Sequence, residues 1–437
     1  MEWQVALVMM LGIVCGAMFL GLPVVIAFFA ANIIGTFVFL GGDPGLASMP
    51  MEFQRAIAKF SLTPIALFLL MGELLFHTGV AFQAIGAIDR LISRIPGRLS
   101  VVSILGGTIF SSLSGSTIAN TAILGSVLLP DMVKRGYHPA MAMGPIMAVG
   151  GIAMLIPPSA LAVLLASLAE YSIAKLLIAG IVPGLLMAFL FFAYVAGRCT
   201  LDPALAPSYE TETLTARERW LPFVKYVVPL FSIFVVVVGS IFFKLAAPTE
   251  AAALGCIASA ITCMCYGALT WRNLKKALLE TAKINTMILI IIAGSLTFSQ
   301  ILAVSGAVDG LLAQITAYDL TALLAVVLMM LVLLLLGAFM DQVSMLLLTL
   351  PFFLPLAMAQ GIDILWLMVL MLIVMEISLL TPPFGLLLFV MKGVAPFKTS
   401  LTQIYAAAAP FVLIELFVLV LLLAFPAMAV WLPKLID

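Results

Sequence analysis

Charged side chains are scarce in this sequence. Asp, Glu, Lys and Arg make up only 9% of its 437 residues, whereas hydrophobic residues make up 65%. A soluble domain carries roughly 25% charged residues, so this composition excludes a water-soluble protein. The 20 basic and 20 acidic residues also leave no net charge. This balance excludes nucleic acid binding as a main role.

Residue types that build catalytic and metal sites are also few. The chain has two histidines and five cysteines, and the closest cysteines, Cys263 and Cys265, stand in an apolar run without partners for a zinc or redox site. It contains neither the phosphate-binding loop of ATPases nor the paired histidines of a zinc protease. We therefore expect no enzymatic activity, no resident cofactor and no ATP hydrolysis by this chain.

Apolar segments of membrane-spanning length fill most of the sequence. They lie at 4–20, 22–41, 62–79, 98–134, 139–169, 173–197, 221–243, 249–269, 285–306, 320–359, 363–391 and 401–431. The predicted fold class is therefore an all-α polytopic membrane protein. The weakly amphipathic stretches 82–95 and 307–316 are expected to lie along the membrane surface. Residues 42–60 are the longest expected external connection.

The chain divides into two related halves. Residues 199–219 are the only sizeable polar stretch and are predicted to be a cytoplasmic linker between a membrane repeat at 1–198 and another at 220–437. Proline and glycine positions recur at an offset of 225 residues, as in Pro23 and Pro248, Gly136 and Gly361, and Pro157-Pro158 and Pro382-Pro383. This recurrence indicates an internal duplication.

The two repeats are predicted to have opposite topology. Segments 98–134 and 320–359 are each interrupted near the middle, and basic residues flank both ends of the first but neither end of the second. Under the positive-inside rule, the two segments are re-entrant hairpins that enter from opposite sides. Each repeat also contains a helix broken by paired prolines, at 139–169 and at 363–391. Inverted repeats with broken helices are typical of secondary transporters.

The tip of the first hairpin is unusually polar. Seven of the eleven residues from Ser111 to Thr121 carry hydroxyl or amide oxygens, which suit a hard cation such as sodium. With backbone carbonyls freed at the first proline pair, the predicted sodium ligands are Ser114, Gly115, Ser116, Asn120, Ile156 and Pro157. The alternative is that small polar residues allow close helix packing and bond back to their own helices.

The tip of the second hairpin carries an acidic residue. Asp341 stands 225 residues after Ser116, and an ionisable group inside a membrane is costly enough to suggest a function. The alternatives are a structural hydrogen bond or an aspartate in water. The predicted second sodium site comprises Gly337, Met340, Asp341, Thr381 and Pro382. The predicted substrate contacts are Ser116, Thr117, Asn120, Pro158, Ser159 and Pro383.

Three further carboxylates occur within apolar segments. Glu73 precedes His77 by one helical turn and is interpreted as a structural pair, and Glu376 lies less than two turns before Pro382. Glu415 stands alone in the last helix, where we expect a contact between helices or subunits.

Several motifs resemble one transporter family. They include SLSGSTIANTAILGSVLLPDMVKRGYHPAMA, MLIPPSALAVLLASLAEYSIAKLLIAGIVPGLL and GAFMDQVSMLLLTLPFFLP. These motifs resemble the large membrane subunit of tripartite ATP-independent periplasmic (TRAP) transporters, the DctM family. The resemblance implies an elevator-type mechanism and sodium-driven uptake of an organic acid, such as a C4-dicarboxylate or sialic acid. Family members commonly carry an acidic residue at the position of Asn120, so this tip lacks that charge.

The resemblance also implies partners and a location. These are a small four-helix membrane subunit, a periplasmic substrate-binding protein and the bacterial inner membrane. One alternative is a stand-alone sodium-coupled carboxylate carrier that needs no binding protein. A channel is disfavoured, because the sequence offers no ring of pore-facing charge. The sequence does not identify the organic acid.

Overall fold

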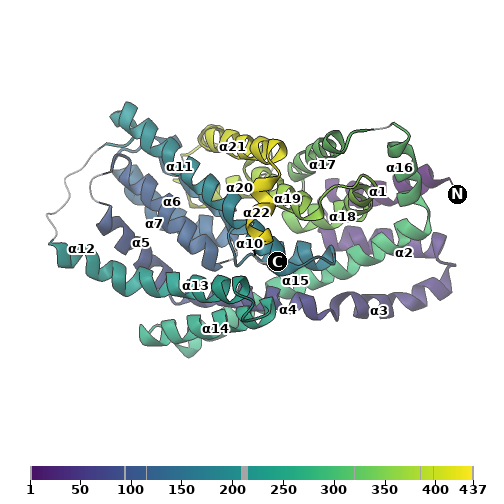
Figure 1. The fold of residues 1–437 in the computed structure, drawn as a ribbon, viewed down its shortest axis with the longest axis horizontal. Helices are drawn as coiled ribbons and strands as arrows, with labels where there is room; N and C mark the ends of the chain where they lie inside the picture. The colour runs from purple at the N-terminus through teal and green to yellow at the C-terminus, as the bar shows by residue number, and fades with distance from the viewer. Residues whose placement is uncertain are drawn as a thin grey trace.

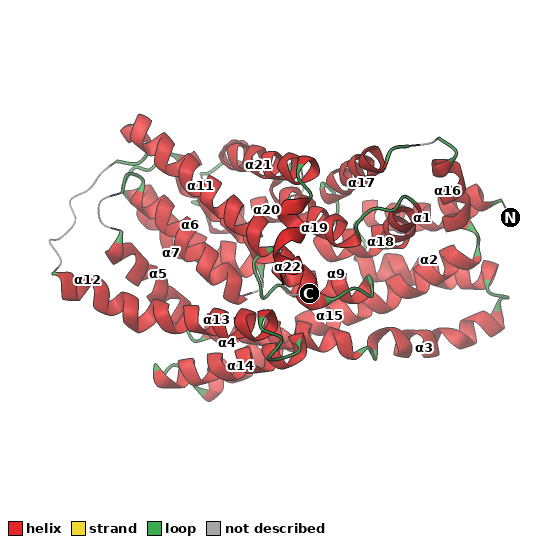
Figure 2. Ribbon diagram, viewed as in Figure 1, coloured by secondary structure: helices red, strands yellow, loops and turns green. Residues whose placement is uncertain are grey.

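The apolar segments form helices in the computed structural model (Figure 1). It describes residues 2–92, 95–114, 116–207, 215–318, 320–383, 385–396 and 398–435, with the side chains of 112–114 left out. This described part contains no strand (Figure 2). Within it, seven helices are long and apolar enough to cross a membrane. The predicted all-α polytopic class is confirmed.

The first half of the chain contains the helices up to α11. Their bounds are α1 Trp3–Phe19, α2 Val24–Phe39, α3 Asp43–Ile57, α4 Thr63–His77, α5 Val80–Leu91, α6 Arg98–Ser114, α7 Thr117–Lys134, α8 Pro139–Gly151, α9 Ala160–Leu168, α10 Ile173–Ala179 and α11 Ile181–Leu201. Short 3-10 turns follow α3 at Phe60–Leu62, α8 at Ile152–Met154 and α11 at Pro203–Leu205.

The second half follows a similar order. Its helices are α12 Ala216–Pro222, α13 Val228–Phe242, α14 Pro248–Cys265, α15 Trp271–Val304, α16 Ala307–Thr316, α17 Ala322–Gly337, α18 Gln342–Ala359, α19 Ile364–Leu380, α20 Leu386–Val394, α21 Leu401–Ala424 and α22 Ala427–Lys434, with a π-helical turn at Phe223–Val227. Helices α7 and α18 each have 18 residues, and they begin at residues 117 and 342, an offset of 225.

Two helices differ from the expected segments. The expected external connection at 42–60 is largely the helix α3, which begins at Asp43 with Pro44 in its first turn, where the fixed φ of proline suits a helix. Helix α15 begins at Trp271 instead of near residue 285, because the hydroxyl of Thr270 caps it by accepting a bond from the Asn273 amide at 3.2 Å. Hydropathy detects only the apolar part of such a helix.

The two hairpins pack on the two broken helices. Helix α6 packs on α7 and α8, and α17 packs on α18 and α19; in Figure 1 the first group lies toward the left and the second toward the right. Helix α19 is apolar all round and buried from Leu365 to Leu380, as expected for a core helix. Helix α21 packs on both α8 and α19.

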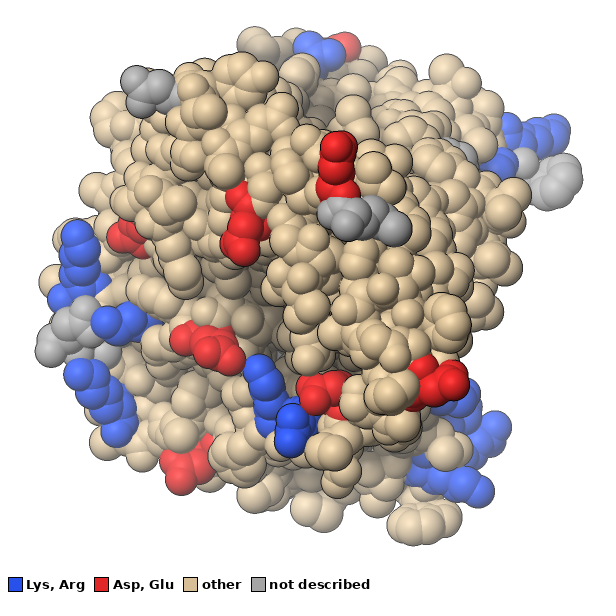
Figure 3. Space-filling model, turned by 90° about the vertical axis from the view of Figure 1, so that its right-hand side faces the viewer, with Lys and Arg blue, Asp and Glu red and all other residues tan. Residues whose placement is uncertain are grey.

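The outer surface is largely apolar. Phe189, Leu331 and Phe417 are 63%, 54% and 52% exposed, although each stands inside a long helix. Charged side chains are few and scattered on the face drawn in Figure 3. A surface of this kind suits contact with lipid tails rather than water, in agreement with a multi-pass membrane protein.

Candidate functional site

Both hairpin tips border one cavity of about 680 Å³, which we call the central cavity. Its walls come from both halves of the chain: the loop before α2, the tips at Ser116–Ile118 and Phe339–Val343, the first helix break at Met154 and Ser159, and one face each of α4 and α15. Asp341 is the only charged side chain among the described residues that line it. The polar side chains there are those of Ser116, Thr117, Ser159 and Gln342.

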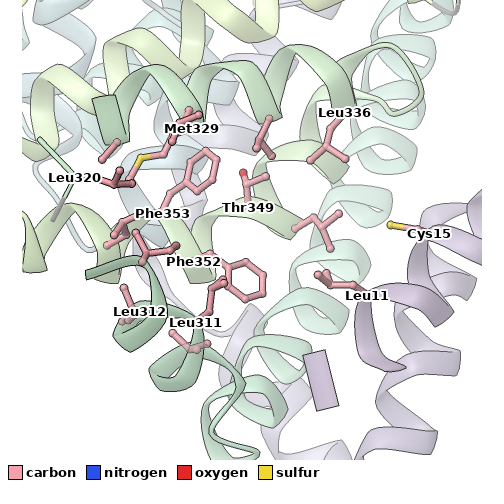
Figure 4. Close-up of a pocket in the computed structure, with 17 residues that line it drawn as sticks. Leu11, Cys15, Leu311, Leu312, Leu320, Met329, Leu336, Thr349, Phe352 and Phe353 are labelled. Atoms are coloured by element: carbon pink, nitrogen blue, oxygen red, sulfur yellow. The ribbon is translucent and has the colours of Figure 1, made fainter. Parts of the chain in front are cut away.

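A second cavity has a different character. It measures about 340 Å³ and lies among α1, α16, α17 and α18 (Figure 4). Its described lining is almost entirely aliphatic and aromatic. The hydroxyl of Thr349 already donates to the Met345 carbonyl at 2.9 Å. This cavity offers no charge or free polar group for an ion or a carboxylate, so the candidate site is the central cavity.

The first hairpin tip begins α7. Ser116 is in an extended conformation, and its hydroxyl accepts a bond from the Ala119 amide at 3.3 Å. Ser116 and the buried Thr117 both line the central cavity, as predicted for substrate contacts. Two predicted ligands cannot be placed in the cavity. The side chain of Ser114 and the whole of Gly115 lie outside the described residues.

Asn120 lies one turn farther along α7 and faces a helix interface. It is fully buried, and its Nδ2 donates to the Ser111 hydroxyl and, at 3.4 Å each, to the carbonyls of Gly107 and Val149. Asn120 does not line the central cavity. Its Oδ1 has no hydrogen-bond partner among the described residues, and neither has the hydroxyl of the buried Thr121. Two neutral oxygens beside α8 therefore remain available to a cation.

The second hairpin tip begins α18 in the same way. Asp341 is exposed to the central cavity, and its Oδ2 accepts bonds from the amides of Val343 at 3.0 Å and Ser344 at 3.2 Å. Its Oδ1 accepts a bond from the Ser344 hydroxyl. Asp341 is thus both a helix cap and a charge that faces the cavity. Met340 also lines the cavity, whereas Gly337 does not.

Gly337 allows a close helix contact instead. A Cβ built on this glycine would lie 2.1 Å from the Cβ of Ser378 on α19. No side chain fits at that distance, so glycine lets the end of α17 approach α19. Gly337 therefore allows α17 to pack closely on α19, the helix that leads to the second proline pair.

The two proline breaks have different surroundings. In the first, Ile156, Pro157 and Pro158 are buried and lie behind the cavity wall, while Met154 and Ser159 line the cavity. The hydroxyl of Ser159 caps α9 by accepting a bond from the Ala162 amide at 3.2 Å. The peptide bond between Pro157 and Pro158 is cis.

In the second break, Thr381, Pro382 and Pro383 are partly or fully exposed and do not line the central cavity. The peptide bond between these prolines is also cis. In an unbroken helix, the residue at position 383 would donate its backbone N–H to the Leu379 carbonyl. Pro383 makes no such bond, because proline has no N–H. The carbonyls of Leu379 and Thr381 both approach Gly385, at 2.6 and 2.9 Å from a Cβ built on that glycine. They form a small group of backbone oxygens beside the start of α20.

Five helices begin at the central cavity. They are α2, α7, α9, α18 and α20, whose first residues Val24, Thr117, Ala160, Gln342 and Leu386 all line it. A helix N-terminus carries a partial positive charge and unpaired N–H groups. Caps such as Ser116 and Asp341 satisfy only some of these donors. These N-termini would favour an anion in the cavity, whose described lining holds no Lys or Arg, whereas the carboxylate of Asp341 would oppose it.

The two halves of the chain touch across the cavity. Gln342 at the second tip donates its Nε2 to the sulfur of Met154 at the first break, at 3.4 Å. The sequence did not mark Met154 as a cavity residue, nor those of α2, α4 and α15, such as Val24, Leu69 and Ile288. These residues are apolar ones within apolar segments, so no composition signal distinguishes them. Pro23, just before α2, was noted through its repeat partner Pro248 but not as a cavity residue.

Known proteins resemble the chain over almost its full length. Residues 11–428 match the family model described as "Tripartite ATP-independent periplasmic transporter, DctM component". The C4-dicarboxylate TRAP transporter large permease DctM of Pseudomonas aeruginosa is 31% identical over 91% of this chain and 92% of its own. The sialic acid TRAP transporter large permease SiaM of Vibrio cholerae is 29% identical over 96% of each chain.

Two further comparisons extend the range of relatives. The ectoine TRAP transporter large permease TeaC of Halomonas elongata is 27% identical over 98% of each chain. Among solved structures, the YdaH transporter of Alcanivorax borkumensis aligns with a TM-score of 0.64 at 14% identity, covering 94% of this chain and 98% of that one. This last likeness concerns the fold alone.

Proposed function

Because the chain belongs to the DctM family of TRAP transporter large permeases, we propose that it imports an organic acid together with sodium ions. The proposed substrate is a carboxylate of the size of a C4-dicarboxylate or sialic acid. The observation that carries this proposal is the central cavity, where five helix N-termini and both hairpin tips meet. Helix N-termini directed at a carboxylate are a recurrent design in secondary transporters.

Asp341 supplies a physical reason for coupling to a cation. Its carboxylate would repel an organic anion in the same cavity. A sodium ion beside Asp341 would remove that repulsion, so that the anion binds well only when the cation is present. The proposed second ion lies at the first tip, where Asn120 Oδ1 and Thr121 Oγ1 have no partner among the described residues.

The membrane potential sets the required number of ions. Moving one elementary charge across the membrane costs or yields roughly 2.3 kcal/mol per 100 mV. Two sodium ions would neutralise a dianion, and a third would make its inward movement electrically favourable. Two sites, one at each tip, account for the first two ions of this proposal.

The proposed movement is an elevator motion of two inverted-topology repeats. The equal lengths of α7 and α18, their offset of 225 residues and their similar caps at Ser116 and Asp341 support this proposal. We also propose that the protein resides in the bacterial inner membrane with a small four-helix membrane subunit. A lining without Lys or Arg among its described residues is expected to bind a dilute anion weakly, so delivery by a periplasmic binding protein is part of the proposal.

Reconstitution tests these proposals. Proteoliposomes that contain this chain and the proposed small four-helix subunit should take up the carboxylate only with an inward sodium gradient and the loaded binding protein. Uptake of similar rate without the binding protein would instead favour a stand-alone sodium-coupled carrier. Uptake at the same rate with and without a sodium gradient would contradict sodium coupling.

A further inference from the structure

Two glutamates are buried without partners in the middle of the protein. Glu376 on α19 and Glu415 on α21 are both 0% exposed. None of their four carboxylate oxygens has a hydrogen-bond partner among the described residues. Burying even one unpaired charge in a membrane protein is costly, so such groups are rarely without a role.

The two carboxylates lie on helices that meet at one junction. Glu376 fits against Gly151, the last residue of α8, where a built Cβ would lie 2.4 Å from its Cγ and 2.7 Å from its Oε1. Helix α21, which carries Glu415, packs on both α8 and α19. Two ionised carboxylates at such a place would repel each other strongly.

The surroundings of the pair are apolar. Phe411, one turn before Glu415, packs edge-on against Phe191 and Tyr194 of α11, with ring centroids 5.4 Å apart in both contacts. Helix α8 contributes no ionisable side chain, and its Gly144 lies directly against Phe411. Water therefore has no evident place beside these carboxylates.

Other ionisable groups on the neighbouring elements do not pair with the glutamates. On elements packed against α19 and α21, or at the caps of these helices, the described groups are His138, Lys175, Tyr194, Arg198, Cys199, Asp202, Asp341, Asp363, Lys392, Tyr405 and Lys434. None forms a hydrogen bond with either carboxylate. Lys392, for example, donates to the Thr399 carbonyl. The described residues thus offer no counter-charge that is hydrogen-bonded to the pair.

We propose that Glu376 and Glu415 form a proton-binding site in the interior of the protein. A proton neutralises a carboxyl group without further ligands, whereas a calcium ion takes about six to eight oxygens, more than the four of this pair. The nearest hydroxyl along α19, that of Ser378, already donates to the Met375 carbonyl at 2.7 Å. The proton is therefore the occupant that this junction accommodates.

The site adjoins both broken helices. Gly151 immediately precedes the first break at Ile152, and Glu376 lies five residues before Thr381 in the second. Loss of the proton would place negative charge near the carbonyls that each break frees. On the premise of the proposed function, sodium affinity should therefore rise when the pair is deprotonated.

Infrared spectroscopy of the purified chain in lipid nanodiscs tests the proposal without any transport assay. In ether-linked lipids, which lack ester carbonyls, and in a Glu73→Gln background, which removes another buried carboxyl group, the otherwise unchanged chain should give at neutral pH a carbonyl band of protonated carboxylic acid. The band should weaken when Glu376→Gln or Glu415→Gln is added and be lost when both are added. Glu2→Gln, which changes an exposed carboxylate, should keep the full band. A double variant with the wild-type band, or a wild type without one, would overturn the proposal.

A stability measurement covers the case in which one variant folds poorly. A protonated buried pair stabilises the folded state at low pH, and this contribution is lost as the pH rises. The melting temperature of the wild type should therefore fall with increasing pH, and a folded single variant should show a smaller fall. A wild-type melting temperature that rises as the pH is raised from acidic to alkaline would contradict the proposal. Because neither measurement involves sodium or substrate, failure of the proposed transport function would leave both results interpretable.

Discussion

Asp341 illustrates how one side chain can serve structure and function together. Its sequence position allowed either a buried structural bond or a coupling role. The structure shows the capping bonds to Val343 and Ser344 and also exposure to the central cavity. A capping carboxylate retains unused lone pairs, because two oxygens offer about four acceptor sites. The structural bonds therefore leave the group able to take the proposed cation.

Replacement of Asp341 by Asn should separate these two roles. Asn is as good a helix cap as Asp, so the fold should persist while the negative charge is lost. We expect sodium affinity in proteoliposomes to fall at least about tenfold, or about 1.4 kcal/mol, with a lower Hill slope. Asp363→Asn is the matched control, since Asp363 caps α19 through the Trp366 amide but does not line the cavity. Unchanged sodium dependence in Asp341→Asn would exclude the second proposed site.

Gly337 should be intolerant of a side chain. In Gly337→Ala the new Cβ would clash with Ser378 on α19, and forced displacement in a packed core costs about 1–3 kcal/mol. We expect a lower melting temperature for this variant. Gly12→Ala in α1 is the control, because nothing lies within 4 Å of a Cβ at that position and alanine favours a helix. Equal melting temperatures for the two variants would show that α17 does not approach α19 in this way.

At the scale of elements, the two proline breaks have the same sequence motif, but their surroundings in the structure differ. Met154 and Ser159 of the first break line the central cavity, whereas among the described residues near the second break only Leu386, at the start of α20, lines it. Under the proposed elevator motion, this asymmetry would correspond to one state of the transport cycle. The repeat pattern could not reveal this difference, since it treats both breaks alike.

The topology of the hairpins is open to a labelling test. In a cysteine-free background, single cysteines at Pro96 and Lys134, both exposed, should react from the cytoplasmic side. Single cysteines at Tyr318 and Gln360, which flank α17 and α18, should react from the other side. The reason is that a re-entrant hairpin returns to the side it entered. Labelling of Pro96 and Lys134 from opposite faces would mean that α6 and α7 cross an odd number of times.

At the scale of the whole molecule, the central cavity exists only because both halves contribute to it. Helices α2, α7 and α9 come from the first half, and α18 and α20 come from the second. Each N-terminus alone favours an anion by about 0.3–1 kcal/mol at an exposed site. Their convergence in a partly enclosed cavity makes the preference selective.

The substrate should therefore be recognised through its negative charge. The amide of the transported carboxylate keeps the shape but loses the charge that the helix N-termini attract. We expect it to compete for binding at least about tenfold more weakly, a loss of about 1.4 kcal/mol. Competition for binding to the reconstituted chain, measured without the binding protein, isolates the contribution of the cavity. Equal inhibition by amide and carboxylate would show that the helix ends do not select the anion.

The sequence by itself determined the helical class, the position of the hairpins and the interruptions within which α7 and α18 begin. Scarce charge, long apolar runs and breaks at Gly, Ser and Pro are local properties, so they can be recognised without neighbours. The predicted contacts Ser116, Thr117, Ser159, Met340 and Asp341 do line one cavity, since each adjoins such a break. Their roles toward sodium and substrate stay predictions.

Only the tertiary structure decided which residues face the cavity and which face another helix. Asn120 turns toward α6 and α8, and Glu415, expected at a contact between helices or subunits, is buried on α21, which packs on α8 and α19. Ile288 and Leu69 line the cavity without any mark in the sequence. The physical reason is that lipid, protein core and an apolar cavity wall select the same hydrophobic residues. Hydropathy therefore locates a helix in the membrane but does not say what each of its faces touches.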